Sequence, residues 1–170
     1  STLFPYTTLF RSMDFVHDQL AMGKKLRILT VVDTHSRLCP AADPRFAYRG
    51  EDVVQTLERV CAKVGYPKTI RVDNGSEFIS RDLDLWAYAN DVTLDFSRPG
   101  KPTDNGFIEA FNSKLRAECL NAHWFMSLAD AREKLDAWRR DYNEVRPHSA
   151  IGYNVPIALH YPDGAASPPS

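Results

Sequence analysis

The chain has 170 residues, 44% of them hydrophobic and 25% charged, with 21 basic and 22 acidic side chains. This length and composition fit one soluble α/β domain with its own core, and no apolar run reaches the ~20 residues of a membrane span. A net charge of −1 argues against a uniformly basic nucleic-acid-binding protein, so DNA binding would need local clusters of Lys and Arg. Three widely spaced cysteines, Cys39, Cys61 and Cys119, indicate reduced thiols in a cytoplasmic protein.

The first part of the chain predicts three strands in an antiparallel meander, followed by a helix. One strand ends at Phe15 and Val16, and a β-branched apolar run at 26–32 predicts a buried second strand. A third strand over 37–46 contains Pro40 and Pro44, which confine it to a sheet edge or interrupt it. Acidic residues then open a helix at 50–52, and Gly65 ends it.

The second part alternates strands and helices. We expect a strand at 69–72, a turn at 73–75, a helix at 83–90, a strand at 92–96 and a loop at 98–102. A helix capped by Thr103 or Asp104 follows, and a long helix runs over 128–145 until Pro147 stops it. This order predicts a mixed five-stranded sheet with helices on both faces. The apolar stripe of the last helix favours core packing over a partner surface; its members are Leu128, Leu135, Trp138 and Tyr142.

Three acidic residues occupy positions that could converge. Asp14 lies on the first strand, Asp73 directly follows a strand, and Glu109 lies on a later helix, with 35 residues between Asp73 and Glu109. Taken singly, Asp73 is explained as a turn residue and the other two as solvated side chains. Taken together, acids at strand ends and on a flanking helix can bind divalent metals through oxygen, which indicates phosphoryl-transfer chemistry.

Five segments carry a family resemblance in the family's own order. They are SMDFVHD (12–18), VVDTHSR (31–37), RVDNGSEF (71–78), RPGKPTDNGFIEAFN (98–112) and DYNEVRPHSAIGY (141–153). Together they resemble the integrase-type catalytic core of bacterial insertion-sequence transposases of the DDE class, over about residues 12–160. The resemblance implies a ribonuclease-H-like fold. It also implies that Asp14, Asp73 and Glu109 are catalytic and bind Mg²⁺ or Mn²⁺ for DNA cleavage and strand transfer.

The same segments suggest residues that contact DNA. They are Lys101, Asn105, Asn112, Lys114, Arg116, Arg146 and His148. On an ideal helix Arg116 lies about 20° around the axis from Glu109 and is the better phosphate contact, whereas Lys114 lies about 140° away and is expected to be solvated. For Arg146 and His148, DNA contact and local packing remain equally open.

The resemblance also predicts the domain limits. Residues 2–12 resemble the in-frame translation of a sequencing adapter, so we expect a foreign tail at 1–12, the catalytic core at 13–160 and a disordered tail at 161–170. The family usually has Trp where this chain has Arg11, which predicts a poorly completed first strand. An upstream helix-turn-helix part would be missing, and the fragment alone would be inactive or weakly nucleolytic.

The expected partners are transposon ends and target DNA, without a membrane. A homo-oligomer is expected in the full-length protein, located in the cytoplasm and nucleoid-associated when on DNA. Two alternatives stay open. One is a ribonuclease-H-like nuclease without strand transfer, and the other is a non-catalytic remnant that only packs or oligomerises.

Overall fold

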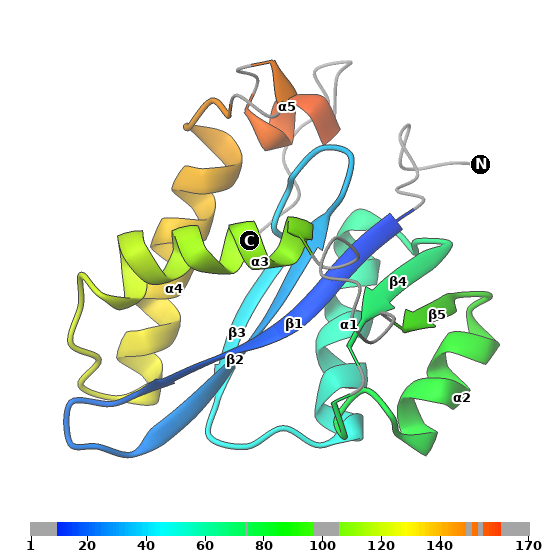
Figure 1. Ribbon diagram of the computed structural model, residues 1–170, viewed down its shortest axis with the longest axis horizontal. Helices are drawn as coiled ribbons and strands as arrows, with labels where there is room; N and C mark the ends of the chain where they lie inside the picture. Colours follow the sequence, from blue (N-terminus) through cyan, green and yellow to red (C-terminus); the bar gives the residue numbers. More distant parts are fainter. Residues whose placement is uncertain (1–9, 74, 97–105, 149–150, 153–154, 161–170) are drawn as a thin grey trace.

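A five-stranded mixed sheet forms the centre of the protein (Figure 1). The structure is a computed structural model that describes residues 10–73, 75–96, 106–148, 151–152 and 155–160. The sheet order is β3-β2-β1-β4-β5. The strands are β1 (Phe10–Gln19), β2 (Lys25–Asp33), β3 (Ala41–Arg45), β4 (Thr69–Val72) and β5 (Thr93–Phe96). The first three pair antiparallel, and β4 joins β1 in parallel, which confirms the predicted meander and mixed sheet.

Helices cover both faces of this sheet, as predicted. They are α1 (Gly50–Val64), α2 (Arg81–Ala89), α3 (Gly106–Leu115), α4 (Leu128–Glu144) and the short α5 (Pro156–His160). A π-helical turn, η2 (Arg116–Leu120), continues α3. Side-chain caps fix the first turns of α2 and α4. Ser80 Oγ accepts from Leu83 N at 3.1 Å, and Ser127 Oγ accepts from Asp130 N at 3.0 Å.

Two hydrophobic cores lie on opposite faces of the sheet, because successive strand side chains point to opposite sides. In β1, Met13 packs into the core beneath α1 and α2, whereas Val16 packs into the core beneath α3 and α4. The stripe of α4 enters the second core, where Leu135 is fully buried. Core packing of this stripe is therefore confirmed.

Strand β1 begins earlier and is better formed than expected. It pairs with β4 from Phe10↔Thr69 to Ser12↔Arg71, so the last three residues assigned to the foreign tail belong to the sheet. Arg11 is 1% exposed, and its guanidinium donates to Val64 O at 3.1 Å. The expectation of a poorly completed first strand was wrong, because the aliphatic stem of Arg11 is buried and its guanidinium is hydrogen-bonded at the end of α1.

The third strand is shorter than the predicted 37–46. Asp33 Oδ1 accepts from His35 N at 2.8 Å and Ser36 N at 2.9 Å, which turns the chain instead of extending it. Arg37 follows with φ 65°, a left-handed conformation that cannot continue a strand. β3 is nevertheless the edge strand, with Pro44 inside it, as the prolines predicted. The expected loop at 98–102, the helix cap at 103–104 and the tail at 161–170 lie outside the described residues.

Candidate active site

The three predicted acids come from neighbouring elements. Asp14 lies within the central strand β1, Asp73 directly follows β4, and Glu109 lies in the first turn of α3. Asp14 and Asp73 each stand two residues beyond the paired positions Ser12 and Arg71 of adjacent parallel strands. Asp14 and Asp73 are half-buried, and Glu109 is exposed.

The negative charges of Asp73 and Glu109 act on the carboxyl of Asp14. Burial raises the pKa of Asp14 to about 6, and the negative charges of Asp73 and Glu109 add to this increase. Hydrogen bonds from Phe15 N and from Asn112 act in the opposite direction. The fold therefore holds Asp14 where ionisation is unfavourable, and a nearby positive charge would relieve the repulsion.

Asp14 is held by a hydrogen-bond chain that sequence reasoning missed. Phe15 N donates to Asp14 Oδ1 at 2.8 Å, and Asn112 Nδ2 donates to Asp14 Oδ2 at 3.2 Å. The hydroxyl of Thr30, which is fully buried and lies opposite Asp14 on β2, donates to Asn112 Oδ1 at 2.9 Å. Thr30 Oγ1 also lies 3.2 Å from Asp14 O. Only the strand register could have revealed Thr30, because 16 residues separate it from Asp14 in the sequence.

Asp73 is oriented by the turn that follows it. Gly75 N donates to Asp73 Oδ1 at 2.8 Å. A Cβ at position 75 would lie 2.9 Å from that same oxygen, so any side chain there would displace the carboxylate. The turn that allowed Asp73 to be interpreted as a structural residue therefore also orients its carboxylate.

An aromatic and ionic contact anchors the loop beyond Asp73. Glu77 forms an ion pair with Arg27 of β2, whose guanidinium lies 4.2 Å from the ring centre of Phe15. Phe15 in turn stacks on Phe78 at 5.0 Å. This contact ties the segment after β4 to the two strands that carry and face Asp14.

The predicted DNA contacts on and after α3 separate onto different surfaces. Asn112 faces Asp14, as described above. Lys114 lies on the side facing α4, with its ammonium 6.0 Å from the ring centre of Tyr142. Arg116 belongs to η2 rather than to α3, so the ideal-helix angle does not apply to it. Its guanidinium donates to the backbone oxygen of His17 on β1 at 2.6 Å.

Arg146 and His148 make local contacts. Arg146 forms ion pairs with Glu118 and, at 3.0 Å, with Asp141. His148 is buried, its Nε2 donates to Tyr142 O at 3.1 Å, and burial lowers its pKa. These contacts favour the packing interpretation, and DNA contact by these two residues stays a prediction. Lys101 and Asn105 lie outside the described residues.

The donor set suits a hard divalent cation, because carboxylate oxygens are the ligands that Mg²⁺ and Mn²⁺ prefer. The crowding of negative charge around the half-buried Asp14 fits such an ion. As they stand, the side chains of the described residues form no group of three His, Cys, Asp or Glu that could hold a metal ion.

Among the described residues, no helix is long and apolar enough to cross a membrane.

Comparison with known proteins gives consistent matches. A family model described as Integrase core domain matches residues 11–102, and a second one with the same description matches residues 90–156. An uncharacterized 31.7 kDa protein of insertion element IS407 from Burkholderia multivorans is 50% identical over 145 residues, which cover 85% of this chain and 52% of that protein.

Another relative, an uncharacterized 39.2 kDa protein of insertion element IS476 from Xanthomonas euvesicatoria, is 45% identical over 83% of this chain and 41% of its own length. The chain thus spans about half the length of these curated relatives. Among solved structures, the HTLV-2 integrase catalytic core domain in complex with magnesium superposes with a TM-score of 0.69 at 16% identity, covering 94% of this chain and 99% of that one. This likeness establishes the ribonuclease-H-like fold.

Proposed function

The chain belongs to the integrase core domain family, and on this premise we propose that it is the catalytic domain of an insertion-sequence transposase that cleaves and joins DNA strands. Its two relatives are proteins of insertion elements, which supports transposition as the process. Asp14, Asp73 and Glu109 are the proposed catalytic acids. The observation that carries this assignment is the register of the parallel strands β1 and β4, which places Asp14 and Asp73 each two residues beyond the paired positions Ser12 and Arg71. The charges of Asp73 and Glu109 also act on Asp14, which supports it.

The cofactor is proposed to be Mg²⁺ or Mn²⁺, held by these three carboxylates. Support comes from the donor chemistry and from the HTLV-2 core, which was solved with magnesium. When bound, divalent cations at such a site activate the attacking oxygen and stabilise the leaving one. Glu109 is exposed in the first turn of α3, and its charge acts on Asp14.

The chain's own residues supply orientation around the acids. Asn112 and Thr30 hold one oxygen of Asp14 in place, and Gly75 N holds one oxygen of Asp73. Arg116, anchored on the β1 backbone, is a proposed contact for a DNA phosphate near the acids. DNA is the proposed partner, with transposon ends and target DNA as substrates, and the full-length protein is proposed to act as a homo-oligomer.

The test is a strand-cleavage and joining assay. Supercoiled plasmid and labelled oligonucleotide duplexes are incubated with the protein and Mn²⁺, in parallel with Asp73→Asn. The matched control is Asp82→Asn, which changes an exposed acid in the first turn of α2. Because the chain alone is expected to be at most weakly active, the assay is run on the core restored upstream, and we expect nicked plasmid and joined oligonucleotides from this protein and from the control, and neither from Asp73→Asn.

Other outcomes discriminate among the functions. Cleavage without joined products would support a nuclease instead of a transposase. Folded wild-type protein that neither nicks DNA nor gains thermal stability with Mg²⁺ or Mn²⁺ would refute the proposed metal-dependent activity of this chain. Equal activity in Asp73→Asn would refute the assignment of the acids.

A further inference from the structure

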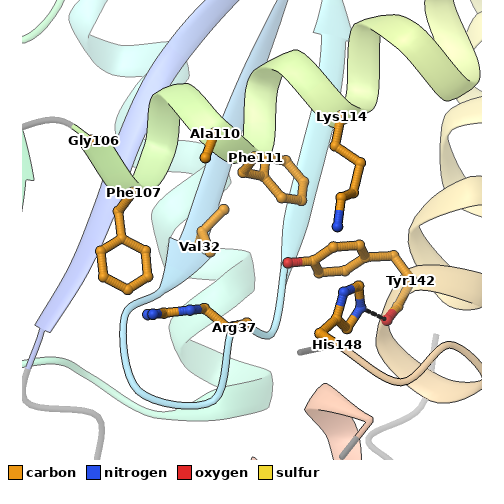
Figure 2. Close-up of a pocket in the computed structure, with 9 residues that line it drawn as sticks. All are labelled: Val32, Arg37, Gly106, Phe107, Ala110, Phe111, Lys114, Tyr142 and His148. Carbon is orange, nitrogen blue, oxygen red and sulfur yellow. Dashed lines mark hydrogen bonds between the residues drawn. The ribbon is translucent and has the colours of Figure 1, made fainter. Parts of the chain in front are cut away.

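A cavity of about 370 Å³ lies beside α3 (Figure 2). It is bounded by α3, by Val32 at the end of β2, by Arg37 in the turn after it, and by Tyr142 and His148 around the end of α4. Successive helix positions differ by about 100°, so the four α3 side chains that line the cavity lie about 100–160° around the axis from Glu109; they are those of Phe107, Ala110, Phe111 and Lys114. The cavity is therefore separate from the acids but uses the same helix.

The lining combines positive charge with apolar and aromatic walls. None of the nine described residues that line the cavity is acidic, while Arg37 and Lys114 are both cationic. The guanidinium of Arg37 lies 3.3 Å from the ring centre of Phe107, a cation–π contact. Ala110 and Val32 supply apolar surface between the charged groups. This chemistry suits a ligand that has a flat ring and a negative charge.

The hydroxyl of Tyr142 is the second observation that indicates a ligand. Tyr142 is 5% exposed, and its ring is fixed by Phe111 at 5.1 Å, Trp138 at 5.3 Å and His148 at 4.3 Å. The hydroxyl points into the cavity (Figure 2), and within the described part of the chain no residue hydrogen-bonds to it. Burial raises the pKa of Tyr142, so the hydroxyl stays a neutral O–H donor. The hydroxyl is open to the cavity, so a bound acceptor can take its hydrogen bond without displacing a described protein partner.

We propose that this cavity binds a nucleotide, with the base against Phe107, Arg37 and the Tyr142 hydroxyl, and with the phosphate at Lys114. A base edge offers acceptors for the hydroxyl, and base stacking on aromatic and guanidinium planes is a common mode of nucleotide binding. An unpaired nucleotide of a DNA strand and a free mononucleotide share this chemistry. The possibility that the bound nucleotide belongs to a DNA strand rests on the proposed function. In that case two faces of α3 would contact the DNA substrate.

Two fluorescent probes test the site and separate the sources. One is the free 5′-monophosphate of 2-aminopurine deoxyriboside, and the other is a duplex with one unpaired 2-aminopurine nucleotide. We expect a saturable fluorescence change with both, at lower concentration for the duplex. Saturation by the free nucleotide alone supports the cavity as a mononucleotide site. No saturable change with either probe overturns the proposal.

Variants locate the binding. Tyr142→Phe keeps the packed ring and removes only the hydroxyl, and should weaken binding about fivefold to tenfold. Ala110→Leu fills the mouth of the cavity and should abolish binding, whereas Ala117→Leu, an equal change at an exposed position of η2, should leave it unchanged. Unaltered binding in Ala110→Leu would overturn the proposal, provided that thermal unfolding shows the variant is folded.

The result can be separated from that of the proposed function. Because none of the described residues that line the cavity is acidic, Asp73→Asn should bind the free nucleotide as the wild type does while losing DNA nicking. If the wild type nicks DNA but binds neither probe, only the proposed nucleotide site is refuted. If the wild type binds the probes but never nicks DNA, only the catalytic assignment is refuted.

Discussion

Replacing Asp14 with Asn should stabilise the metal-free protein at neutral pH. The carboxyl of Asp14 has a folded-state pKa of about 6 against an ordinary value of 3.8, mainly because it is buried and secondarily because Asp73 and Glu109 are charged. Each pKa unit corresponds to 1.36 kcal/mol, so the difference of 6 − 3.8 = 2.2 units sets an upper bound of about 3 kcal/mol. Since Asp14 is only half-buried, solvent screening reduces the expected gain to about 1–2 kcal/mol.

The sign of the pH dependence follows from the raised pKa. Folding takes up a proton at Asp14, so the favourable contribution is complete below about pH 4 and is lost as the pH rises through about 6. The amide that replaces the carboxyl in Asp14→Asn carries no charge at any pH. The difference in unfolding free energy between the variant and the wild type should therefore increase from pH 4 to about 6 and then stay constant.

The structure shows how the amide of Asp14→Asn can be accommodated. Its oxygen can accept from Phe15 N, as Asp14 Oδ1 does now. The amide of Asn112 can then turn over, so that its oxygen accepts from the new amide nitrogen and its own nitrogen donates to the hydroxyl of Thr30. That hydroxyl keeps an acceptor in the backbone oxygen of residue 14, which lies 3.2 Å away. No hydrogen bond of the chain is lost.

The assay is urea unfolding followed by circular dichroism in EDTA between pH 4 and 8, with Asp82→Asn as the control for a carboxylate on the surface. A gain in stability that is equal at pH 4 and pH 7, or a variant that is less stable than the wild type above pH 6, would contradict the electrostatic account. Adding Mg²⁺ should make the wild type more stable than Asp14→Asn, because a ligand stabilises only a folded protein that binds it.

Two further predictions concern buried polar contacts. Thr30→Val removes the hydroxyl that fixes Asn112, and should weaken Mn²⁺ binding measured by calorimetry at least tenfold, as loss of outer hydrogen bonds to metal ligands generally does; unchanged affinity would contradict a positioning role. Asn143→Ala should lower the free energy of unfolding by about 2–3 kcal/mol, because the buried amide bonds both Cys39 N and Cys39 O at 2.8 Å. Glu144→Ala, at the neighbouring exposed position, should change it by less than about 0.5 kcal/mol in the same denaturation experiment.

Much of the architecture could be predicted because its signals are local. The apolar run at 26–32 and the helical spacing over 50–64 fall inside β2 and α1, and β4 has the predicted bounds of 69–72. The prolines placed β3 at the sheet edge, since Pro cannot donate to a strand partner. These features depend on side-chain periodicity and backbone chemistry within a few residues.

Errors arose where a contact from elsewhere in the chain decided the outcome. Arg11 completes β1 because α1 offers its guanidinium a backbone acceptor, which no local pattern reveals. Arg116 leaves the ideal helical path because α3 passes into a π-helical turn. Likewise, only the folded chain shows that Arg146 pairs with Glu118 and Asp141, which favours local packing over DNA contact, the two possibilities that the sequence left equally open.

The sequence by itself determined the element order, the fold class and three acids in the family's motifs, because motif and periodicity are properties of residue type and spacing. Only the tertiary structure decided how those acids are held. Strand register set Thr30 opposite Asp14, helix packing brought Asn112 between them, and burial raised the pKa of Asp14. The cavity behind α3 is also a tertiary feature, since its walls come from segments that meet only when the sheet and helices pack together.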